Sequence, residues 1–90
     1  MRLTELEPRE IPTNNIRADT RITFRCPSCR LGAVIVDLKL GPFDPKNGSH
    51  ATTALPPAWG DMSITPSIDD VGMCRHCNGW HGHITNGEVR

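Results

Sequence analysis

The sequence has 90 residues, with ten Lys and Arg balanced by ten Asp and Glu and only four aromatic side chains. This length suffices for one domain, the balanced charge disfavours the basic surface typical of nucleic-acid binding, and no apolar run approaches the roughly 20 residues of a membrane span. Leu, Ile, Val and Phe together make up only 19 residues, so a further stabilising element is expected, and the four cysteines are the obvious candidate.

Residues 1–20 show neither a helical nor a strand-like period and include Pro8 and Pro12. We expect them to form an N-terminal arm that is ordered only where something holds it. The beginning of the sequence contains no apolar segment of the kind found in secretory signals, which argues against secretion by a signal peptide. Residues 21–90 are expected to form the folded domain.

Two strands are predicted in the first half of this domain. Residues 21–25 alternate polar and apolar side chains, and residues 32–40 alternate more strongly. In the second of these strands one face carries four apolar side chains, those of Val34, Val36, Leu38 and Leu40.

Residues 41–60 contain four prolines and are predicted to be a loop. A loop of this length in a small domain is either functional or flexible. It carries Phe43, Leu55 and Trp59, which we expect to be exposed and take as a candidate binding surface.

The C-terminal part is predicted to be β structure as well. Residues 61–65 read as a short strand that Pro66 ends. Residues 80–85 and 88–89 flank Asn86-Gly87, a pair typical of the two-residue type I′ turn of a β-hairpin. No segment supports a helix of ten residues, so the sequence predicts a small all-β fold.

The four cysteines form two C-x2-C pairs, Cys26 with Cys29 and Cys74 with Cys77, separated by 44 residues. Two such pairs on one short chain are typical of a zinc site, because Zn²⁺ takes four tetrahedral thiolates and each tight turn supplies two. Backbone amides in such turns can also donate to the sulfurs. The separation is long for this class of site, but loop-closure entropy grows only logarithmically with length. The sequence therefore predicts a zinc-ribbon-like β domain with one structural Zn²⁺.

Other interpretations of the cysteines have weaker support. Disulfides need an oxidising compartment, and a redox C-x2-C motif should open a helix, whereas a strand-like run follows Cys29. Free thiols or an iron site remain as alternatives. His81 follows Cys77 closely enough to chelate, so a set of Cys26, Cys29, Cys77 and His81 is an alternative to four cysteines.

Four short matches in order give the chain a family resemblance: Cys26-Pro-Ser-Cys29, Thr65-Pro-Ser-Ile68, the Cys, Trp and His cluster that follows, and the Asn86-Gly87 hairpin. Residues 22–89 thereby resemble a family of small bacteriophage and prophage proteins of unknown function, many of which carry the label "ammonia monooxygenase". The resemblance implies a phage origin and a zinc-binding β fold, and it implies no chemistry. In that family the second half of the metal site looks like one Cys and a nearby His, whereas this sequence has Cys74, Cys77 and His81.

Catalysis has little support in the sequence. There is no H-E-x-x-H motif and no H-x-E motif before the cysteines, and four thiolates would leave a metal no open position. A zinc-dependent hydrolase or nuclease is therefore a minor alternative.

A binding role is the remaining expectation. We expect a protein that acts by protein–protein contact with a phage or host protein, as a homo-oligomer or as a neighbour in a virion, located in the host cytoplasm or the particle. The alternative is a nucleic-acid-binding zinc ribbon that acts in the infected host, because many zinc ribbons have that role.

Overall fold

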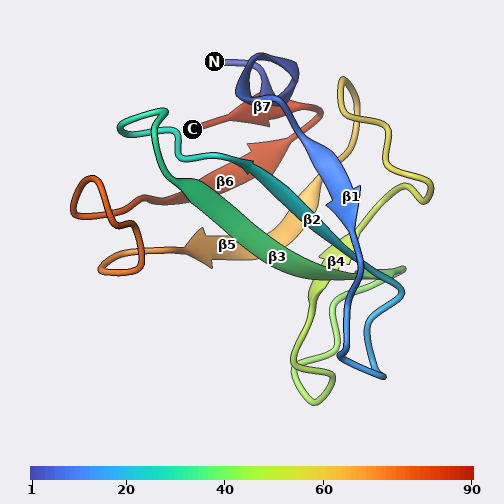
Figure 1. The fold of residues 1–90 in the computed structure, drawn as a ribbon. Helices are drawn as coiled ribbons and strands as arrows, with labels where there is room; N and C mark the ends of the chain where they lie inside the picture. Colours follow the sequence, from blue (N-terminus) through green and yellow to red (C-terminus); the bar gives the residue numbers. More distant parts are fainter.

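The computed structural model describes residues 1–90 and is all-β, as predicted from the sequence. Seven strands form one curled sheet in which each strand lies beside its neighbours in the sequence, in the order β1-β2-β3-β4-β5-β6-β7 (Figure 1). The strands are β1 (Arg9–Ile11), β2 (Thr20–Arg25), β3 (Ala33–Leu40), β4 (His50–Thr52), β5 (Ile64–Asp69), β6 (His81–Thr85) and β7 (Glu88–Val89). All neighbouring pairs are antiparallel except β3 and β4. No helix of the structure is long and apolar enough to cross a membrane.

The long hairpin of β2 and β3 confirms the two strands predicted from alternation. Phe24 pairs with Val34 and Ile22 with Val36, and these four side chains are buried on the inner face. Leu40, predicted on the same face, is about half exposed, because it ends β3 and lies beyond the core. The alternating pattern therefore sets the register of the hairpin and which face of it is buried.

The core lies between two halves of the curled sheet, β1–β3 and β5–β7, which the short β4 connects. The buried apolar side chains come from both halves and from the N-terminal segment: Leu3, Leu6, Ile22, Phe24, Cys26, Val34, Val36, Leu38, Met62, Ile64, Ile68, Trp80, Ile84 and Val89. Phe24 and Trp80 meet edge to face with ring centroids 6.2 Å apart, an arrangement that aromatic pairs favour.

Residues 1–20, expected to form an N-terminal arm that is ordered only where something holds it, are held against the sheet in the structure. Leu3–Leu6 form a 3₁₀-helix, η1, and β1 adds an edge strand beside β2. Leu3 and Leu6 are both 0% exposed, and the Leu3 amide donates to the Gly87 carbonyl at 2.8 Å. The segment is part of the core, and its elements of three and four residues are too short to give a period in the sequence.

Two further details of the C-terminal half differ from the prediction. Residues 41–60 include β4, which pairs in parallel with the end of β3. Strand β5 begins at Ile64 and runs through Pro66, where the pairing with β6 shifts register between Ile64 and Ile68. Proline is tolerated at such a bulge because the ladder does not need its missing amide there. The predicted Asn86-Gly87 hairpin is confirmed, with both residues at positive φ.

Candidate metal centre

The two C-x2-C pairs lie in turns that connect neighbouring strands. The first cysteine turn, residues 26–29, follows β2, and the second, residues 74–77, lies between β5 and β6. Both turns lie on the same side of the molecule (Figure 1), and all four sulfur atoms lie within 4.8 Å of one another. Two cysteine pairs with 44 residues between them are therefore brought together by the curl of the sheet.

The sulfur atoms have the spacing of a tetrahedral site. Cys26 Sγ lies 3.7 Å from Cys77 Sγ, and Cys29 Sγ lies 3.6 Å from Cys74 Sγ. Four ligands at the zinc–sulfur distance of about 2.3 Å would be about 3.8 Å apart, so these spacings fit a metal ion. All four cysteines are free of disulfide bonds. The four cysteines can therefore hold a metal ion.

Backbone amides donate to the sulfurs, as predicted for turns of this kind. The Leu31 amide lies 3.5 Å from Cys29 Sγ, the His76 amide 3.5 Å from Cys74 Sγ and the Gly79 amide 3.2 Å from Cys77 Sγ. These bonds orient three of the four sulfurs and stabilise negative charge on them.

Two small residues, Ser28 and Gly32, bring the two cysteine turns together. The Ser28 hydroxyl donates to the Gly79 carbonyl at 3.0 Å and links the first turn to the second. Gly32 lies so close to Cys74 that a Cβ atom at this position would be only 2.5 Å from the Cys74 sulfur. A residue with a side chain therefore does not fit there unless the sulfur or the backbone moves. The small side chains at these positions were the available signal, but their partners are far away in the sequence.

The electrostatics of the cluster favour a bound cation. Amides of Gly32 and Leu31 lower the pKa of the Cys29 thiol to about 6. At Cys77 the Gly79 amide also favours the thiolate, but burial and the three neighbouring thiols outweigh it and raise the pKa to about 12. Several thiolates at this spacing repel one another, and a divalent cation removes that repulsion.

The cluster lies at the edge of the hydrophobic core. Cys26 is 0% exposed, and the other three cysteines are partly buried and pack against the core. A metal ion held there would join the two halves of the sheet at the point where the core ends.

His81, the alternative ligand, lies outside the sulfur cluster. Its Nε2 atom is 3.1 Å from the Ser67 hydroxyl oxygen on the neighbouring strand β5, and the group of possible metal ligands consists of the four cysteines. His81 begins β6 and is exposed, and its side chain contacts the neighbouring strand β5 and not the cysteines.

The candidate binding surface of Phe43, Leu55 and Trp59 differs in exposure from the expectation. Phe43 is 45% exposed, whereas Leu55 and Trp59 are partly buried and Trp59 packs against the core. The largest exposed apolar side chains near the cysteines are instead Leu31 (68%), Val71 (61%) and Met73 (74%). We call these three residues the cysteine-turn patch. Apolar residues beside C-x2-C pairs in otherwise polar loops were the signal that could have found them.

The chain matches no protein-family model, and no curated protein or solved structure is significantly similar to it. The interpretation of the centre therefore depends on its own geometry.

Proposed function

We propose that the four cysteines hold one structural Zn²⁺ and that the domain stabilised in this way acts without catalysis, by protein–protein contact. The observation that carries the proposal is the sulfur cluster, with spacings of 3.6 and 3.7 Å across the two turns. Soft thiolate ligands in a tetrahedral set select zinc or iron, and the closed four-cysteine set is typical of structural zinc.

The ligand set supports a structural role for the metal. A catalytic zinc keeps one position for water or substrate, with three ligands from the protein. Here four sulfurs can fill a tetrahedral shell. The chain is also short and has a small core, so a metal contribution to folding is expected.

The cysteine-turn patch supports a role in contact with another protein. Leu31, Val71 and Met73 are each more than 60% exposed, and loops held by a metal ion present them at fixed positions. All three belong to the segments around the cysteine turns, and large exposed apolar side chains that form a contiguous patch mark interaction sites. The resemblance of residues 22–89 to phage proteins supports a phage or host protein as the partner, and a second copy of this chain is a further candidate.

Native mass spectrometry of the full chain, with and without a chelator, tests the metal. We expect one Zn²⁺ per chain and loss of β-sheet circular dichroism when the chelator removes it. A chain that carries no metal, or that keeps its fold after chelation, would contradict the structural zinc. The same spectrum reports any oligomer.

Photo-crosslinking tests the contact. A photoreactive amino acid at Met73 in the zinc-loaded chain should give nuclease-resistant protein adducts, whereas the same group at Ile16, which is 98% exposed, should not. Salt-dependent retention on DNA at physiological ionic strength, with adducts that nuclease removes, would instead support the nucleic-acid-binding zinc ribbon.

A further inference from the structure

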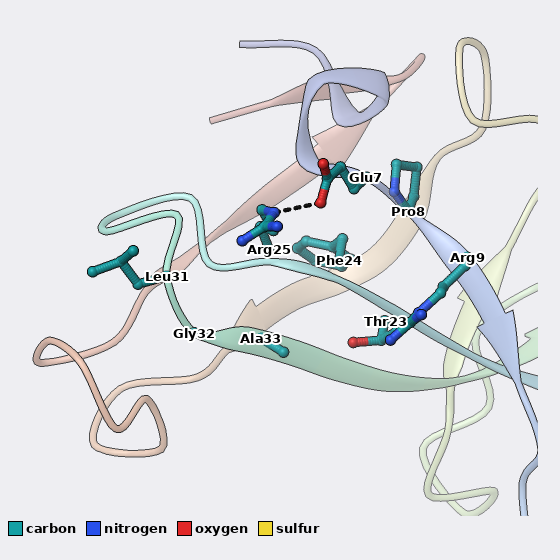
Figure 2. Close-up of a pocket in the computed structure, with 9 residues that line it drawn as sticks. All are labelled: Glu7, Pro8, Arg9, Thr23, Phe24, Arg25, Leu31, Gly32 and Ala33. Carbon is teal, nitrogen blue, oxygen red and sulfur yellow. Dashed lines mark hydrogen bonds and ion pairs between the residues drawn. The ribbon is translucent and has the colours of Figure 1, made fainter.

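A hollow of about 450 Å³ lies on the sheet face opposite the core, beside the first cysteine turn (Figure 2). It is lined by the start of β1, by β2 and by the start of β3. Thr23 alternates along β2 with the core residues Ile22 and Phe24, so its side chain points to this outer face. Leu31 of the cysteine-turn patch is one of the lining residues, so the hollow reaches the patch at this side chain.

Two polar groups in the hollow have no partner. The guanidinium of Arg9 forms neither an ion pair nor a side-chain hydrogen bond, although Arg25 in the same hollow is paired with Glu7 and also donates to the Arg30 carbonyl at 3.1 Å. The neighbouring Arg21 on this face is likewise paired, with Asp37 at 2.7 Å. The Thr23 hydroxyl has no hydrogen-bond partner either, and Thr23 lies opposite Arg9 in the register of β1 and β2. One unpaired guanidinium and one unpartnered hydroxyl, on a Thr23 residue that is 7% exposed, therefore line the same hollow.

The charge of the lining favours an anion. Arg9 and Arg25 carry two positive charges, and Glu7 carries the single negative charge. A guanidinium presents parallel N–H donors that match the two oxygens of a carboxylate, and the Thr23 hydroxyl can supply one more donor. Leu31 and Ala33 add apolar surface for the neighbouring side chains of a ligand.

The edge of the sheet lies beside these groups. Strand β1 pairs only with β2, so its other edge is unpaired. An unpaired edge can take up an extended segment of another chain through backbone hydrogen bonds. Such a segment would place every second side chain on the face that carries the hollow.

We infer that this hollow binds an extended acidic segment of a partner protein, with one Asp or Glu carboxylate held by Arg9 and Thr23. This inference rests on the proposed function, because it names the chemistry of the partner that the protein contacts. Leu31 would serve both surfaces, as a wall of the hollow and as part of the cysteine-turn patch.

Peptide libraries test the inference on the zinc-loaded full chain. One library of seven-residue peptides has Asp fixed at its centre, and the matched library has Asn there. In ¹⁵N–¹H spectra the Asp library should shift the amides of Thr23 and Ala33 and the Arg9 Nε–H signal, whereas the Asn library should leave them in place. Equal shifts with both libraries, or none with either, would overturn the inference.

Three variants locate the binding. Using a peptide selected from the Asp library, Arg9→Gln should weaken binding by about tenfold or more, since a charge-assisted hydrogen bond is lost, and Thr23→Val should weaken it severalfold. Arg17→Gln makes the same change of charge in the loop at the opposite end of β1 and β2, and it should bind like the wild type. Equal affinity of Arg9→Gln and Arg17→Gln would overturn the inference.

The proposed function and this inference can fail separately. If Met73 still crosslinks to a protein while the Asp library does not bind, the acidic segment is refuted and the protein contact stands. If the chain keeps its fold without metal, the structural zinc is refuted whatever the libraries show. Stronger shifts of the same amides by a single-stranded DNA oligonucleotide than by any peptide would overturn the acidic segment.

Discussion

Replacing Gly32 by alanine tests whether the sulfur cluster is a metal site. A Cβ atom at position 32 would lie 2.5 Å from the Cys74 sulfur, whereas ordinary van der Waals contact begins at 3.4 Å. The backbone of Gly32 is not at positive φ, so alanine adds no backbone strain. The one contact shorter than van der Waals distance that the substitution adds is with the Cys74 sulfur.

The size of the effect follows from this distance. Relief of the contact requires the sulfur or the backbone to move by roughly 1 Å, whereas metal–ligand distances tolerate only about 0.2 Å. Overpacking of this kind costs about 1–3 kcal/mol, which corresponds to a zinc affinity weakened by roughly 5- to 150-fold. The close contact exists only while Cys74 is held in the sulfur cluster, so the change should act through zinc affinity.

Competition with a chromophoric chelator measures the zinc affinity of Gly32→Ala, and Gly60→Ala is the matched control. Position 60 has no atom within 4 Å of the added Cβ and no positive φ. Both variants lower the entropy of the unfolded chain equally, so their difference reports the contact with Cys74. Affinities of the two variants within twofold of each other would refute the geometry of the centre.

Three other perturbations probe the metal and the core. Cys26→Ser removes one ligand and should abolish cooperative folding in the presence of zinc, because structural zinc supplies on the order of 10 kcal/mol to small domains; an unchanged melting curve would contradict the structural role. Leu6→Ala should lower the free energy of unfolding by about 2–5 kcal/mol and the Tm by roughly 10 °C or more. Calorimetry checks this against the exposed control Thr4→Ala. Equal Tm values of the two variants would mean that the N-terminal segment does not contribute to the core. Zinc affinity should rise with pH between 6 and 8 by at least about tenfold per unit, because the raised pKa of Cys77 means that its thiol must lose a proton to bind; a flat profile in the chelator titration would argue against thiolate ligation by Cys77.

The parts of the fold that could be predicted are those with a strong local pattern. Val34, Val36 and Leu38 alternate with other residues along the eight residues of β3, and Asn86-Gly87 is typical of a type I′ turn. The β2–β3 and β6–β7 hairpins can therefore be predicted from the sequence. Elements formed by long-range contact could not be found in this way. Strand β4 has three residues and a parallel partner, and η1 is a single turn.

The candidate metal site also has features that can be predicted from the sequence and features that cannot. The grouping of the four cysteines is predictable, because metal coordination requires these residues at this spacing. The contacts of Ser28 with Gly79 and of Gly32 with Cys74 are not, because each joins residues that only the folded sheet brings together. The sequence also does not show that Arg9 is unpaired, because this depends on the ion pair that Arg25 forms with Glu7 in the folded chain.

The order of the strands has a consequence for folding kinetics. Every pair of neighbouring strands is consecutive in the chain, so the sheet can grow by adding one strand at a time. The sulfur cluster joins positions 45 and 51 residues apart, and closing a loop of this length costs about 3 kcal/mol of chain entropy or more. We therefore expect zinc to act late in folding, by trapping an already paired sheet, so that added zinc slows unfolding far more than it speeds refolding.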